Sequence, residues 1–173
     1  MSEPVAWENR IVGEGSKPAS QFIANPLNWR THPVAQREAV TASLNDLGWI
    51  QRVIVNRRTG YLIDGHERVM NAMQHGDQPV PFVEVDLSEQ EEALALAILD
   101  PLSAMATTDA AKLDELLREC QTGEAALQEM MAAMAKDAGI IPKDAPDEFE
   151  EMDENIETEH TCPKCGYAWS GGK

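Results

Sequence analysis

The chain has 173 residues, of which 43% are hydrophobic and 25% are charged, and its formal net charge at pH 7 is −16. This length allows one core of ordinary size, and the acidic balance excludes DNA binding by the whole surface because DNA would be repelled. No apolar run of about 18 residues occurs, so no membrane-spanning helix is predicted.

The first part of the chain predicts short strands and one helix. Apolar pieces between residues 5 and 24 alternate with Gly and Pro, which indicates one or two short strands. Residues 25–33 are expected to form an irregular loop, because proline disfavours helical angles at the residue before it. A helix follows, with Thr31 or His32 as its cap, and Gly48 ends it.

A β-hairpin is predicted next. It consists of a β-branched run at residues 51–56, a turn at 57–60 and a second strand at 61–64. A helix is expected at 66–75, and another strand follows at 80–87. Alternating strands and helices of this kind indicate a small α+β domain.

The sequence after residue 87 predicts helices. Ser88-x-x-Glu91 is a capping box, and the helix that it opens is expected to end before Pro101. Asp109 is expected to cap a second helix, and Gly123 separates it from a third. The third helix carries a methionine cluster: Met130, Met131 and Met134. Such a cluster is typical of a core or a partner-facing surface, not of a cofactor site.

The end of the chain combines an acidic segment with a cysteine pair. Residues 141–159 are rich in Asp, Glu and Pro and predict a flexible acidic linker. In residues 160–173, Cys162 and Cys165 stand two residues apart before a glycine, which fits half of a tetrahedral zinc site. His160 is the third candidate ligand. The fourth would come from Glu159 or from the partner chain of a homodimer, and a truncated zinc ribbon is an open alternative.

The cysteine count and the N-terminus indicate the cellular compartment. The chain has three cysteines. An odd number with one close pair favours metal-bound or free thiols in a reducing compartment over disulfides. The first residues lack the apolar centre of a secretory signal peptide. We therefore expect a cytoplasmic protein.

Charge is distributed unevenly along the chain. Residues 1–82 carry eight basic and eight acidic side chains, whereas residues 83–173 carry six basic and twenty-two acidic ones. Contact with DNA would therefore come from a local basic patch in the first half. Its candidates are Arg30, Arg37, Arg52, Arg57, Arg58 and Arg68. The acidic helices and the C-terminal tail are expected to contact a protein partner.

The segment from Asp64 to Arg68 is the strongest candidate for chemistry. Gly65 follows an apolar strand, and His66, Glu67 and Arg68 stand where a helix begins. A helix N-terminus offers unpaired N–H groups and a partial positive charge, so Gly65 and Arg68 predict an anion or phosphate site. His66 and Glu67 are candidates for an acid–base pair or, for the carboxylate, a Mg²⁺ ligand; simple exposed polar residues are the alternative.

Residues 25–86 resemble the N-terminal domain of the ParB/sulfiredoxin superfamily. The shared order is an Asn-Pro loop, a helix ending in Gly, a strand opening at Gln51, a hairpin, and a Gly-x-x-Arg turn before a helix. The turn Asp-Gly-His-x-Arg is similar to that of ParB-like domains in phage and bacterial proteins, often fused to or encoded near DNA methyltransferases. The resemblance implies a small mixed sheet with helices in residues 1–87 and a helical extension in 88–140.

The resemblance also implies ligands and site residues. It implies binding of a nucleoside triphosphate, CTP or ATP, with Mg²⁺, and it assigns phosphate binding to Gly65 and Arg68. Further pocket residues are Gln51, Asn25, Asn28, Arg30 and His32, although the asparagines could instead cap turns. His66 replaces the catalytic cysteine of sulfiredoxins, which excludes sulfinic-acid reduction.

Three functional hypotheses follow. The first is a nucleotide-binding, DNA-associated module from a phage or mobile-element setting. The second is a non-enzymatic adaptor that recruits a DNA methyltransferase or a replication protein, which the acidic helices favour. The third is a ParB-like nuclease, phosphotransferase or NTPase. The sequence of the first domain shows no clustered set of acidic metal ligands, which disfavours this third hypothesis.

Overall fold

A computed structural model describes residues 6–141, 160–166 and 168–169. The chain divides into two compact units, Met1–Ile141 and Pro142–Lys173, which we treat separately. Residues 142–159 of the predicted acidic linker lie outside the described residues. Among the helices of the described ranges, none combines the length and the apolar character needed to cross a membrane.

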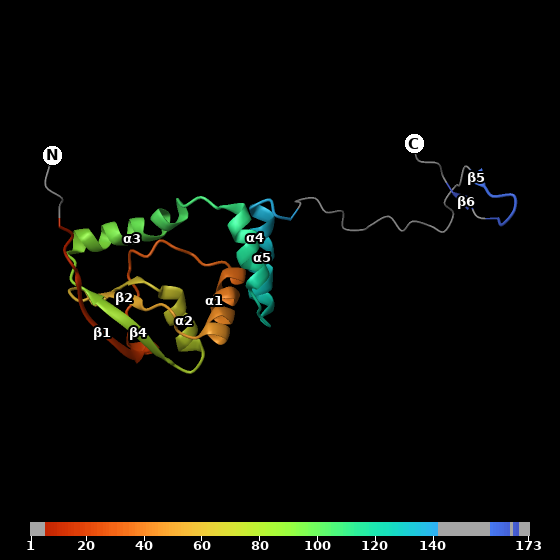
Figure 1. The fold of residues 1–173 in the computed structure, drawn as a ribbon. Helices are drawn as coiled ribbons and strands as arrows, with labels where there is room; N and C mark the ends of the chain where they lie inside the picture. Colours follow the sequence, from red (N-terminus) through yellow and green to blue (C-terminus); the bar gives the residue numbers. More distant parts are fainter. Residues whose placement is uncertain (1–5, 142–159, 167, 170–173) are drawn as a thin grey trace, which may run out of the picture. The chain divides into compact units, whose positions relative to one another are not determined.

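A four-stranded mixed sheet forms the centre of the first unit (Figure 1). The strands lie in the order β1 (Ile11–Pro18), β4 (Pro79–Val85), β2 (Val53–Asn56) and β3 (Leu62–Asp64). β4 is antiparallel to β1 and parallel to β2, while β2 and β3 form the expected antiparallel hairpin. The α+β class and the small mixed sheet are therefore confirmed.

The core lies between this sheet and helix α2 (His66–Gln74), together with the short 3₁₀ helix η1 (Ala19–Gln21). Val69 and Ala72 face the strands because they stand three residues apart on one side of α2. The buried apolar cluster comprises Ala19, Phe22, Val53, Val55, Leu62, Val69, Ala72 and Val80. Its burial fixes the start of α2 against the ends of β2 and β3.

Helix α1 (Val34–Leu47) packs against α2, with a hydrogen bond between Thr41 and Asn71. Gly48 ends the helix as expected, with a φ of +67°. The predicted cap was wrong, because Pro33 is the N-cap and no side chain caps the first turn. The φ of Pro33 is −57°, and its side chain has no polar atom that could cap the first turn.

Helix α3 (Glu89–Ala104) begins with the predicted capping box. Glu91 N donates to Ser88 Oγ at 3.3 Å, and Ser88 N donates to the Glu91 carboxylate at 2.7 Å. The expected end before Pro101 was wrong, since the helix continues to Ala104. Pro101 lies in the last turn, where its missing N–H removes only one helical hydrogen bond.

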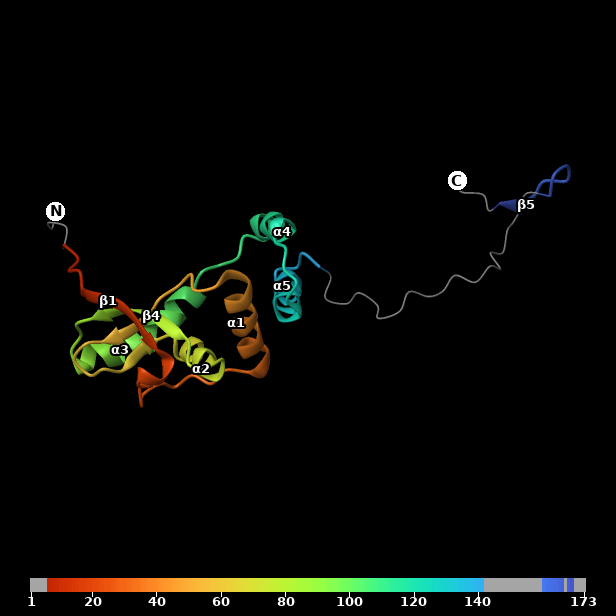
Figure 2. The ribbon, with the colours of Figure 1, turned by 90° about the horizontal axis from the view of Figure 1, so that it is seen from below.

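Two further helices complete the first unit. Asp109 caps α4 (Ala110–Glu119) by accepting from Lys112 N at 3.2 Å, as predicted. Helix α5 (Ala125–Asp137) lies alongside α1 in both views (Figures 1 and 2). The second unit contains a short hairpin of β5 (His160–Thr161) and β6 (Ala168–Trp169).

Candidate nucleotide-binding site

Gly65 connects β3 to α2 in a backbone conformation that requires glycine. Its φ is +91°, in the left-handed region that other residues rarely adopt. A Cβ atom there would overlap Val53 Cγ1 and lie 2.8 Å from Val53 Cβ. The start of α2 is therefore pressed directly onto β2, and its first N–H groups have no intrahelical acceptor.

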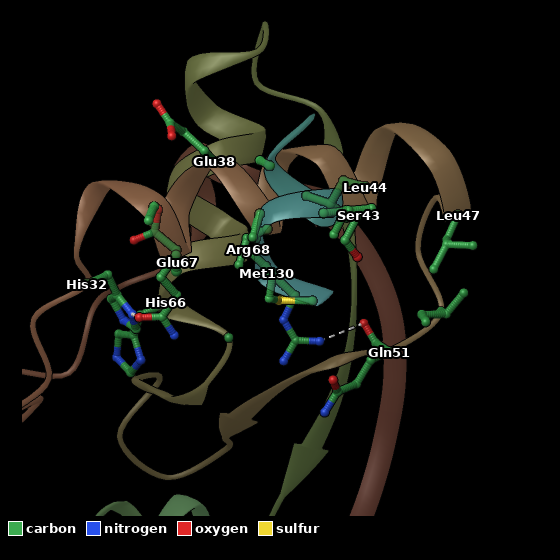
Figure 3. A pocket seen from close by; sticks show the side chains of 18 of the residues that line it. His32, Glu38, Ser43, Leu44, Leu47, Gln51, His66, Glu67, Arg68 and Met130 are labelled. Atoms are coloured by element: carbon green, nitrogen blue, oxygen red, sulfur yellow. Dashed lines mark hydrogen bonds between the residues drawn. The ribbon is translucent and has the colours of Figure 1, made fainter. Parts of the chain in front are cut away.

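Arg68 is held beside this turn by two contacts, of which Figure 3 shows the one with Gln51. One terminal nitrogen lies 2.7 Å from Asp64 Oδ2, and the other donates to the Gln51 carbonyl at 3.2 Å. These contacts use only part of the five donors of a guanidinium group. The guanidinium of Arg68 is thus held in place beside the N-terminus of α2.

His66 forms a hydrogen bond with the loop at Asn25. Its Nε2 atom lies 3.3 Å from the backbone N of Asn25, so it accepts that hydrogen bond and Nδ1 carries the proton. Burial lowers the pKa of His66 below its usual 6.5; Asp64 opposes this shift, and Arg30 and His32 add to it. The imidazole is therefore neutral near pH 7.

A His66→Gln variant is expected to lose part of the pH dependence of stability. Below pH 6.5 the unfolded state takes up a proton before the folded state does, so falling pH destabilises the wild type. Glutamine can accept the Asn25 bond but does not titrate. Urea unfolding at pH 7.5 and 5.5 should show a smaller loss of stability in the variant, and an equal loss in both proteins would contradict this assignment.

A pocket of about 820 Å³ gathers the predicted site residues. This volume lies within the usual range for small-molecule sites. The predicted residues that line the pocket are Asn28, Arg30, His32, Gln51, Gly65, His66, Glu67 and Arg68. Figure 3 shows His32 and His66 together at one side and Arg68 with Gln51 at another. Glu67 is also tied to α2, since its Oε1 accepts from Asn71 Nδ2 at 3.2 Å.

Among the residues predicted for the nucleotide site, Asn25 does not line the pocket. It is buried, and its Oδ1 accepts from Leu27 N at 2.9 Å, which is the turn-capping role. Its Nδ2 donates to Glu92 Oε1 at 2.7 Å. Asn25 therefore supports the pocket from behind, because its backbone N–H also holds His66.

Sequence reasoning missed three acidic residues around this site. Asp64 orients Arg68, and Asp100 pairs with Arg30 at 2.7 Å. Glu92 is buried and also accepts from Asn56 Nδ2 and Thr59 Oγ1, each at 2.5 Å. The position of Asp64 inside the turn motif was an available signal, whereas Glu92 and Asp100 come from a helix distant in sequence.

The arginines proposed for DNA contact are mostly paired with carboxylates. Within the described residues, four of them form ion pairs: Arg30 with Asp100, Arg52 with Glu14, Arg58 with Asp86, and Arg68 with Asp64. Arg37 and Arg57 are exposed. The local positive charge is thus smaller than the arginine count suggests.

The cysteine pair lies in the tight turn between β5 and β6. Gly166 N donates to the Cys162 carbonyl at 2.9 Å, and Gly166 has a φ of +74°. Backbone N–H groups of Lys164 and Cys165 hydrogen-bond to the Cys162 thiolate and hold its pKa below the usual value. The side chain of His160 and all of Glu159 lie outside the described residues. In the described ranges, no three His, Cys, Asp or Glu side chains gather as a metal site.

Comparisons with known proteins gave structural similarities alone. No protein-family model matches the sequence, and no curated protein matches it. The fold is similar to the C-terminally truncated chromosome-partitioning protein ParB from Caulobacter crescentus complexed with CTP-γ-S, at 22% identity and a TM-score of 0.49, over 62% of this chain and 61% of that one. A Pnob8-like ParB-N domain is similar at 18% identity and a TM-score of 0.44, over 72% and 50% of the two chains. This chain therefore spans less than two thirds of either structure.

Proposed function

We propose that the pocket binds a nucleoside triphosphate, CTP or ATP, with its phosphates at the Gly65–Arg68 turn. The observation that carries this proposal is the placement of Gly65 against Val53, which presents the bare N-terminus of α2 in the pocket wall beside an oriented Arg68. Backbone N–H groups, a helix dipole and a guanidinium together favour a phosphate group.

The other pocket residues fit this ligand. Arg30 lines the pocket, and its buried Nε is, within the part of the chain that the structure describes, a side-chain donor without an acceptor. Glu67 is the carboxylate that would hold Mg²⁺ beside the phosphates. His66 and Glu67 are the proposed acid and base if the nucleotide is hydrolysed. His66 Nε2 would first have to release the N–H of Asn25.

Thermal unfolding with CTP, ATP, GTP and UTP, each with and without Mg²⁺, tests this function. A nucleotide at one hundred times its dissociation constant should stabilise the protein by about 2.7 kcal/mol. We expect at least one nucleotide to do so, and repetition with added DNA tests a DNA-associated role. Unchanged unfolding with all four would contradict nucleotide binding.

The second candidate function is a non-enzymatic adaptor. Helix α3 and its C-cap residue expose large apolar side chains, with Leu94 and Leu102 each 58% and Met105 76% accessible. Such a surface beside acidic residues fits a protein partner or a second copy of the chain. A DNA methyltransferase or a replication protein is the partner class proposed. This function predicts complex formation without nucleotide.

The hairpin at the C-terminus is proposed to hold zinc through Cys162 and Cys165, with His160 and a partner chain's residue completing the site. The backbone hydrogen bonds to the Cys162 thiolate support it, because zinc binds thiolates in this form. Metal analysis should find zinc in the wild type and not in a Cys162→Ser, Cys165→Ser variant. Equal zinc content in both would dismiss the proposal.

A further inference from the structure

The pocket has two walls of different chemistry. One wall is the polar turn and loop described above. The other is apolar and comes mainly from two helices: Ala39, Val40, Leu44 and Leu47 of α1, and Ala126, Leu127, Met130 and Ala133 of α5; Trp49 and Ile50, which follow α1, also line the pocket. A ligand that fills both parts therefore has a polar end and an apolar end.

The position of the donors sets the direction of such a ligand. On the side of α1 and α5 the pocket is lined by Glu38 and Glu129, and none of the lining residues there is an arginine or lysine. The polar side carries the carboxylates of Asp64, Glu67 and Asp100, but it also holds both lining arginines, Arg30 and Arg68, and the N-terminus of α2. These are the donors suited to phosphate oxygens, so in the proposed arrangement the phosphates lie at the turn and the other end of the ligand faces α5.

Helix α5 presents a surface suited to a ring. Ala126, Met130 and Ala133 follow one another at spacings of four and three, so they share one helix face. Two small residues flank one long, flexible thioether, which packs favourably against aromatic rings. Met130 projects into the same pocket as Arg68 (Figure 3) and is 44% exposed.

We infer that α5 forms the base-binding wall of the nucleotide site, with Met130 as the residue against which the nucleobase packs. This inference rests on the proposed function and extends it. It makes the helical extension after residue 87 part of the site, because α5 reaches the pocket by packing on α1. Met130 thus contributes to affinity for the base and not for the phosphates.

Calorimetric titration of the full chain with two ligands tests this assignment. The ligands are the nucleotide that stabilises the protein most and inorganic tripolyphosphate, which has the same anionic groups without base or ribose. Met130→Ala should weaken nucleotide binding about five- to tenfold and leave tripolyphosphate binding within about twofold. Met134→Ala is the matched control, since Met134 has similar exposure, at 42%, and lies outside the pocket. It should change neither affinity.

A second variant covers the case in which the pocket adapts to the smaller side chain of Met130→Ala. Ala133→Trp fills the space beside Met130 and should reduce nucleotide binding while sparing tripolyphosphate. If nucleotide binds all variants as tightly as the wild type, α5 is not the base wall, although the nucleotide site stands. If the wild type binds neither ligand, the proposed function and this inference both fall.

Discussion

Replacement of Gly65 with alanine should destabilise the first unit by about 2–5 kcal/mol, because backbone strain and overpacking act together. The φ of +91° is unfavourable for alanine, and the new Cβ would lie 2.8 Å from Val53 Cβ. Val53 is fully buried in the core and cannot move aside without disturbing β2. Urea unfolding followed by circular dichroism measures the loss.

Gly60→Ala is the matched control for this variant. Gly60 also has a positive φ, +77°, but a Cβ there would meet nothing within 4 Å. It should therefore cost only the backbone strain, about 1 kcal/mol. If the two variants lose equal stability, the contact of Gly65 with Val53 does not fix the start of α2.

Glu92→Gln is expected to cost about 2–4 kcal/mol of unfolding free energy. The Glu92 carboxylate accepts hydrogen bonds from Asn25, Asn56 and Thr59, and it is only 4% exposed. In the variant, the NH₂ group of glutamine replaces one carboxylate oxygen. It cannot accept hydrogen bonds from these neighbouring donors, so at least one buried group loses its partner. The same unfolding measurement applies.

Glu89→Gln provides the control for charge and helix position. Glu89 lies in the same first turn of α3 but is exposed, so its replacement should change stability by less than about 0.5 kcal/mol. Glu92→Gln should also loosen the loop at Asn25, which holds His66. Equal stability of the two variants would mean that Glu92 does not anchor α3 to the sheet.

Local signals predicted most of the fold. Gly48, the Ser88 capping box and Asp109 mark helix ends by interactions within a few residues, and the structure places those ends as expected. The exceptions are the start of α1 at Pro33 and the end of α3 near Pro101. The effect of a proline depends on where in the helix it lies, and the sequence pattern does not give that place.

The polar half of the site was also predictable, because the residues of the turn are adjacent in sequence. The support from Glu92 and Asp100 was not predicted, since Glu92 meets Asn25, and Asp100 meets Arg30, across more than sixty residues of chain. The sequence predicts Met130 as a core or partner-facing residue. Helical spacing identifies the face of α5 on which Met130 lies. It does not predict that α5 packs on α1, and this packing brings Met130 to the pocket.

The most direct test of the central claim is a comparison of nucleotide affinity between wild type, Arg68→Ala and Arg57→Ala by titration calorimetry. Arg57 is exposed and lies outside the pocket, so it controls for the loss of one positive charge. A nucleotide site at this turn predicts at least about tenfold weaker binding for Arg68→Ala and an affinity within about twofold of wild type for Arg57→Ala. Equal affinities in all three proteins would contradict phosphate binding by the Gly65–Arg68 turn.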